Sequence, residues 1–116
     1  MTAEQLASQV MARLETLGQI SEEPGRLTRP YGSPAMRRAN ELAAAWMRAA
    51  GMAARTDAVG NLIGRYEASH ADAKTLLLGS HLDTVRDAGK YDGALGVVAA
   101  IACVQRFHEE KRRLSG

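Results

Sequence analysis

The sequence contains few of the residues that define specialised protein classes. Its 116 residues include one cysteine, three prolines and only 4% aromatic side chains. A single cysteine, Cys103, cannot form an internal disulfide, which excludes a disulfide scaffold and favours a reducing, cytoplasmic location. With 46% hydrophobic residues and 11 glycines, the composition also excludes disordered and collagen-like chains. We therefore expect a globular chain of no more than one domain.

Long apolar runs and a strong net charge are missing as well. No stretch approaches the roughly 18 consecutive apolar residues of a membrane span, and the N-terminus interleaves polar residues in a way that a secretory signal does not. The net charge is +2, from 15 basic and 13 acidic residues. These features predict no membrane partner and no nucleic-acid partner. Four arginines of the N-terminal half are interpreted as a solvated loop and helix face: Arg26, Arg29, Arg37 and Arg38.

Sequence patterns predict three helices and a hairpin. Thr2 and Gln5 form a capping box before apolar residues spaced by three and four, and Ser33-Pro34 is typical of a helix start. A later run is apolar nearly all round, which predicts a mostly buried helix with Cys103 in the core. Trp46 is expected to anchor the second helix. The predicted helices cover 3–18, 35–50 and 94–107, and the predicted hairpin strands cover 52–57 and 61–66.

A further strand is predicted at 75–78, where the sequence is Thr-Leu-Leu-Leu. Because it is apolar on both faces, it suits the centre of a sheet covered by helices on each side. The fold class expected is α/β, a partial three-layer α/β/α arrangement with a mixed sheet. Such a strand and a buried helix need more neighbours than the predicted elements supply, so the chain is expected to be the first part of a larger domain. An uncovered sheet edge predicts aggregation of the chain made alone.

Three side chains with metal-binding chemistry lie between this strand and the last helix. His81 and Asp83 follow the strand, and their i, i+2 spacing places both on one side of the backbone. Asp83 could therefore accept a hydrogen bond from the imidazole, while Asp92 stands at a helix start that favours a carboxylate. One imidazole and two carboxylates suit zinc, manganese or cobalt better than calcium. Each residue alone is more often structural, but together they form a candidate metal site.

The segment TLLLGSHLDTVRDAGKYDGALGVVAAI resembles the metal-site segment of the dinuclear-metal amidohydrolases that include allantoate amidohydrolase and N-carbamoyl-L-amino-acid hydrolase. TRPYGSPAMRRANELAAAWMRAAGM and TDAVGNLIGRY resemble the same family. The short connection ending in GKYDG is more similar to this branch than to the related zinc aminopeptidases and carboxypeptidases. The resemblance implies a zinc-exopeptidase-like catalytic domain, hydrolysis of a linear ureido or carbamoyl C–N bond with release of ammonia and carbon dioxide, and a role in purine catabolism.

The resemblance also implies roles for individual residues. His81 would ligate one metal ion, Asp92 would bridge two, and Asp83 would serve catalysis by orienting His81. The Asp92–Gly93 peptide matches a position that is often cis in this fold. The implied cofactors are two divalent ions, zinc or manganese, with cobalt or nickel as alternatives. The full-length enzyme would be a homodimer that takes a small ureido substrate.

The family places a Glu-Glu pair, further histidine ligands and a dimerisation domain later in the chain. Residues 1–116 are accordingly expected to be the N-terminal part of one truncated catalytic domain, inactive alone because the general base is absent. Glu109 and Glu110 are not that pair, since a helix rising 1.5 Å per residue puts them roughly 25 Å beyond Asp92. Two alternatives stay open: a peptidase or N-acyl-amino-acid hydrolase of the same fold, and an inactive remnant.

Overall fold

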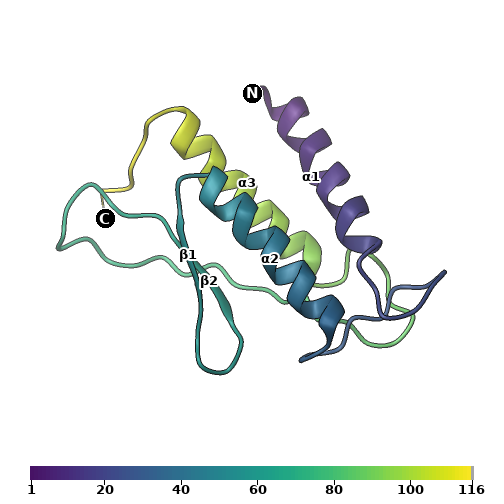
Figure 1. The fold of residues 1–116 in the computed structure, drawn as a ribbon. Helices are drawn as coiled ribbons and strands as arrows, with labels where there is room; N and C mark the ends of the chain where they lie inside the picture. Colours follow the sequence, from purple (N-terminus) through teal and green to yellow (C-terminus); the bar gives the residue numbers. More distant parts are fainter. Residues whose placement is uncertain (116) are drawn as a thin grey trace.

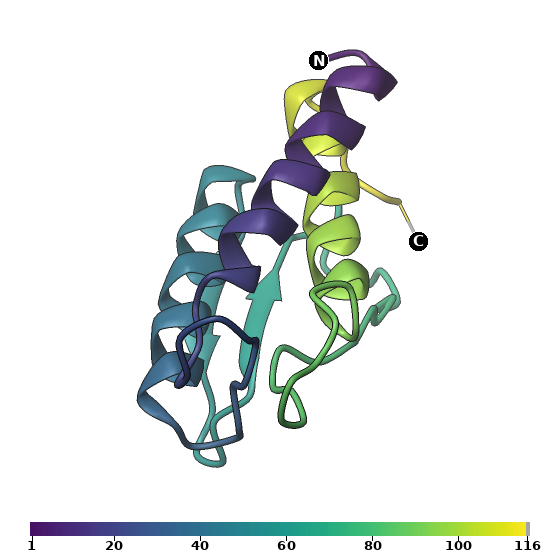
Figure 2. The same ribbon diagram turned by 90° about the vertical axis from the view of Figure 1, so that its right-hand side faces the viewer.

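The computed structural model describes residues 1–115 and has three helices of 16 residues each over one small antiparallel sheet. Helix α1 packs along α3, and α2 packs on both α3 and the two strands (Figure 1). Figure 2 shows α1 lying across the helical side of the molecule, away from the sheet. The elements are α1 (Ala3–Gly18), α2 (Pro34–Ala49), β1 (Ala53–Thr56), β2 (Leu62–Arg65) and α3 (Ala94–Glu109).

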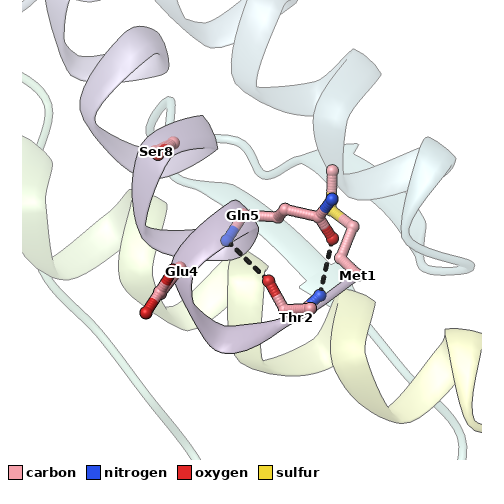
Figure 3. Close-up of a pocket in the computed structure, with 5 residues that line it drawn as sticks. All are labelled: Met1, Thr2, Glu4, Gln5 and Ser8. Carbon is pink, nitrogen blue, oxygen red and sulfur yellow. Dashed lines mark hydrogen bonds between the residues drawn. The ribbon is translucent and has the colours of Figure 1, made fainter.

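The first two helices begin where the sequence predicts. The Gln5 N–H donates to the Thr2 hydroxyl at 3.1 Å and the Thr2 N–H donates to the Gln5 side chain at 2.8 Å, which completes the capping box (Figure 3). In α2, the Ser33 hydroxyl accepts from the Met36 N–H and Pro34 occupies the first turn. Local hydrogen bonding thus fixes both helix starts to the residue.

One apolar core lies where the three helices meet. Leu14 and Leu17 of α1, small residues of α2 and Val98 of α3 are fully buried in it. Leu82 joins the same cluster from the segment that precedes α3. Alanines at 39 and 43 let the helices approach closely, which compensates for the low aromatic content. The core therefore anchors the chain between the two predicted metal-site residues His81 and Asp83.

The predicted hairpin is confirmed with shorter strands. Its register pairs Ala53 with Arg65 and Thr56 with Leu62. The Asp57 carboxylate closes the turn by accepting from the Val59 N–H, the Asn61 N–H and the Asn61 side-chain amide. These bonds, first that of the Asn61 side chain, lower the pKa of Asp57.

The prediction of a central strand at 75–78 is wrong for the described residues. This segment runs without strand pairing, and its leucines at 76, 77 and 78 are exposed, Leu77 by 86%. A strand needs a partner for its backbone groups, and the two strands within residues 1–115 pair with each other. The expected mixture of helix and strand is present, whereas residues 1–115 hold only the antiparallel pair β1–β2 as a sheet.

Helix α3 is less buried than its composition predicts. Val98 and Ile101 lie in the core, but Leu95 is exposed. Cys103 is exposed too, so its assignment to the core is wrong. A uniformly apolar helix has no single preferred face, and here it buries only the side that contacts α1 and α2. Trp46 does pack against the core, half-buried on α2, as predicted.

Candidate metal centre

The segment from Ser80 to Thr84 brings two of the predicted site residues together. The middle residue, Leu82, is buried in the core, so the flanking His81 and Asp83 both face outward, 50% and 46% exposed. His81 Nδ1 lies 3.5 Å from Asp83 Oδ1. The expected placement of the two side chains on one side of the backbone is confirmed.

The shortest contact of His81 is with main chain. Its Nδ1 lies 2.8 Å from the backbone oxygen of Asp83, closer than to the carboxylate. A carbonyl oxygen can only accept, so this hydrogen bond requires the proton on Nδ1, which in the neutral imidazole leaves the lone pair on Nε2. Imidazole with a free Nε2 lone pair is the form that ligates metal ions. Asp83 therefore accepts the expected hydrogen bond from His81 mainly through its backbone oxygen.

Asp92 stands at the N-terminal end of α3, and its carboxylate does not form a cluster with the His81 imidazole and the Asp83 carboxylate. It is exposed, and its N–H donates to Gly89. Within residues 1–115, no group of three histidine, cysteine, aspartate or glutamate side chains is close enough to share a metal ion. The structure thus pairs His81 with Asp83 and places Asp92 nearby in the chain without completing a site.

Gly93 follows Asp92 in the chain and packs against His81. Its φ is +71°, and a Cβ there would lie within 2.5 Å of both the His81 Nδ1 and the His81 carbonyl oxygen. The Ser80 hydroxyl also donates to the Gly93 carbonyl at 2.8 Å. The start of α3 thus packs directly on the histidine. The peptide between Asp92 and Gly93 is trans, since residues 1–115 contain no cis bond, so the expectation of a cis peptide is wrong here.

A small pocket of about 150 Å³ opens beside His81 and Asp83. Its other polar lining comes from Ser80 beside them and from Tyr31, Asn40 and Asn61, on the loop before α2, on α2 itself and on the hairpin turn. A wider and more open hollow surrounds the capping box of α1 and contains none of the predicted site residues (Figure 3). The first pocket is therefore the one that belongs with the candidate site.

Sequence reasoning missed Arg29. The sequence predicts a solvated arginine here, but only 1% of Arg29 is exposed. Its guanidinium donates to the backbone oxygens of Leu82, Leu17 and Ile20. Burial lowers its pKa, and the nearby charge of Asp83 opposes that shift. No sequence signal separates this arginine from its exposed neighbours, because its acceptors are carbonyls distant in the chain.

The acidic pair at the end of α3 lies away from the site, as expected. Glu109 Oε2 lies 3.3 Å from the N-terminal amino group, and Glu110 accepts from Arg106 at 2.7 Å. Both carboxylates therefore pair with charges at the far end of the helix from His81.

The chain is similar in sequence to known hydrolases. The family model of Peptidase family M28 matches residues 61–115. Allantoate deiminase 2 of Glycine max is 45% identical over 103 residues, which are 89% of this chain and 21% of that protein. N-carbamoyl-L-amino acid amidohydrolase of Geobacillus stearothermophilus is 46% identical over 98 residues, or 84% of this chain and 24% of that protein. Over most of its length the chain is therefore similar to these amidohydrolases.

A solved structure supports the same assignment. The crystal structure of a hydantoinase/carbamoylase family amidase from Burkholderia ambifaria matches with a TM-score of 0.86 and 34% identity, over 93% of this chain and 27% of that one. The predicted resemblance to this family and the predicted fold class are confirmed. The chain spans about a fifth to a quarter of the length of the curated relatives named above.

The family is of the metal-dependent peptidase and amidohydrolase type. The donor chemistry at His81 and Asp83 fits a divalent ion, because an imidazole nitrogen and carboxylate oxygens are the usual protein ligands of zinc and manganese. None of the helices within residues 1–115 has the length and apolar character needed to cross a bilayer.

Proposed function

We propose that this chain contributes the first metal-site residues of an amidohydrolase that cleaves a linear ureido or carbamoyl C–N bond. The observation that supports it best is the His81–Asp83 pair, in which Nδ1 lies 2.8 Å from the Asp83 backbone oxygen and 3.5 Å from the Asp83 carboxylate. The names of the relatives, allantoate deiminase and N-carbamoyl-L-amino acid amidohydrolase, support allantoate or an N-carbamoyl-L-amino acid as substrate. An allantoate substrate would place the enzyme in purine catabolism.

Each residue has a distinct part in this proposal. His81 would bind a metal ion through Nε2, Asp92 would bind through its carboxylate, and Asp83 would keep the imidazole proton on Nδ1. Two divalent ions, zinc or manganese with cobalt or nickel as alternatives, would supply an activated water and polarise the scissile carbonyl. The polar pocket beside His81 would receive part of a small, hydrogen-bonding substrate.

The wider organisation belongs to the same proposal. Residues 1–116 would form the N-terminal part of one catalytic domain, and the general base and further ligands would come from other residues of the whole protein. That protein would be a cytoplasmic homodimer with no nucleic-acid or membrane partner.

The test is made on the full-length protein. We expect ammonia release from allantoate or from an N-carbamoyl-L-amino acid, loss of that release on removal of metal by a chelator, and recovery with Zn²⁺ or Mn²⁺. His81→Ala and Asp92→Asn should each lower the rate at least a hundredfold. His70→Ala and Asp72→Asn are matched controls, because both residues are exposed and lie outside the site.

One alternative has its own support. The match to the Peptidase family M28 model favours a peptidase or an N-acyl-amino-acid hydrolase. Release of amino acids from peptides or acylated amino acids, with no ammonia from ureido compounds, would replace the proposed substrate class with this one. A full-length protein that binds no metal and hydrolyses none of these compounds would be an inactive remnant.

A further inference from the structure

Arg29 differs from the surface arginines of this chain in being almost completely buried. It is among the largest fully buried side chains of residues 1–115. The guanidinium Nε donates to the Leu82 carbonyl at 2.9 Å. A second nitrogen donates to the carbonyls of Leu17 at 2.8 Å and Ile20 at 2.9 Å, at the end of α1. Arg29 therefore ties the end of α1 to the peptide that lies between His81 and Asp83.

The chemistry of these contacts requires a guanidinium. A buried cation is costly unless its donors are satisfied, and here three backbone oxygens from two separate segments accept from three of the five N–H donors. The planar fork of arginine directs its donors along fixed and divergent lines, whereas a lysine ammonium is a single point on a flexible stem. The C-terminal end of α1 carries excess negative potential on its free carbonyls, which further favours a cation at this place.

The main chain of Arg29 binds the same segment two residues further on, at Thr84. Its N–H donates to the Thr84 hydroxyl at 2.8 Å, and its carbonyl accepts from the Thr84 N–H at 2.8 Å. Arg29 thus contacts the residues on both sides of Asp83. Loop 27–29 and loop 84–88 continue side by side, with an isolated bridge between Leu27 and Ala88.

Held at Leu82 and Thr84, the intervening Asp83 peptide has little freedom, and it is the carbonyl of this residue that accepts from His81 Nδ1. We propose that Arg29 is a positioning residue: by fixing the Leu82–Thr84 backbone it keeps the His81 ring in the Nδ1-protonated form with Nε2 free for metal. The metal part of this inference rests on the proposed function, while the tautomer of His81 can be measured without any metal.

The experiment compares wild-type full-length protein with Arg29→Lys, which keeps the charge and loses the fork. The imidazole of His81 is observed by ¹⁵N NMR in the metal-free protein, and Co²⁺ affinity is measured from the visible absorption of the bound ion. We expect Arg29→Lys to reduce the Nδ1-protonated population of His81 and to weaken Co²⁺ binding by about ten- to a hundredfold, the usual effect of residues that orient a ligand. Arg38→Lys, on an exposed arginine of α2, should change neither.

Ile101→Ala is the control for a general loss of stability, because Ile101 lies in a second core cluster that does not contain Leu82. It should lower the melting temperature and leave both His81 readouts unchanged. If Arg29→Lys fails to fold, Thr84→Val removes the acceptor of the Arg29 N–H, and Thr84→Ser retains it. Only Thr84→Val should then shift the tautomer and weaken Co²⁺ binding.

The outcomes separate the two proposals. An unchanged His81 tautomer and unchanged Co²⁺ affinity in Arg29→Lys, or in Thr84→Val where that variant is used, would overturn the positioning role and leave the proposed function standing. A wild-type protein that binds no Co²⁺, yet loses the Nδ1-protonated form on substitution of Arg29, would overturn the proposed metal site and support the positioning role.

Discussion

At the scale of single residues, the site depends on the absence of a side chain at position 93. Gly93 has a positive φ, and its Cα faces the His81 ring so closely that a Cβ would collide with ring and backbone together. Glycine is the residue that adopts this conformation without cost. The start of α3 and the histidine can therefore share this space only in a chain with glycine here.

We expect Gly93→Ala to destabilise the fold by about 1–3 kcal/mol, through a strained backbone and a displaced His81. Thermal unfolding measures the stability, and Co²⁺ titration measures the site. Gly89→Ala is the matched control, because a Cβ at Gly89 would meet no atom within 4 Å. Equal melting temperatures for the two variants would contradict the proposed packing of Gly93 on His81.

Asp57, at the hairpin turn, makes a pH-dependent contribution to the stability of the fold. Its pKa in the folded chain is lowered, first by the Asn61 side chain, so its stabilisation is fully present above the usual aspartate value of about 3.9 and is lost as the pH falls through the lower, folded value. Asp57→Asn should therefore flatten the loss of stability below about pH 4. Urea unfolding at neutral and acidic pH measures this, with Asp72→Asn as control. An undiminished acid loss in Asp57→Asn would contradict it.

At the scale of elements, the helix starts were the most predictable feature. Thr2, Gln5 and Ser33 act on backbone groups within three residues of themselves, so a short stretch of sequence contains all the information that these caps need. The hairpin was predictable for the same reason, since Asp57 and Asn61 form its turn locally.

Features that depend on distant partners were not predictable. Residues 75–78 have strand character, but a strand forms only when another lies beside it. Arg29 resembles its exposed neighbours in sequence, and only the fold brings the carbonyls of Leu17 and Leu82 to it. The pairing of His81 with Asp83 was predictable from their spacing, whereas the role of the Asp83 backbone oxygen was not.

The capping box of α1 provides a test at this scale. Thr2→Ala removes the acceptor for the Gln5 N–H and should lower the free energy of unfolding by about 0.5–2 kcal/mol. Chemical denaturation measures the change. Ser8→Ala, an exposed position in the middle of the same helix, should have little effect. A Thr2→Ala variant as stable as Ser8→Ala would show that the cap contributes nothing.

At the scale of the whole molecule, the chain is flat. Its principal extents are 45 × 36 × 18 Å, and the shortest suits one layer of helices on one sheet, at about 10 Å per layer. Residues 76–78 lie exposed as a consecutive apolar stretch. Consecutive exposed apolar residues with unpaired backbone groups favour association between chains.

We therefore expect the 116-residue chain made alone to self-associate, and Leu77→Lys to shift it toward monomer. Size-exclusion chromatography with light scattering measures the change. Val59→Lys adds the same charge at an exposed apolar residue of the hairpin turn and should leave the association unchanged. A wild-type chain that is monomeric and melts in one sharp transition would contradict this prediction.

The contacts of Arg29 also bear on the order of events during folding. The bond to Leu82 joins residues 53 positions apart, and α2 and the whole hairpin lie in the loop that it closes. Closing a loop of this length costs chain entropy before any contact repays it, whereas helices and hairpins form from near neighbours within microseconds. The helices and the hairpin should accordingly form early. His81 should adopt its final conformation only when loop 27–29 and loop 84–88 have come together.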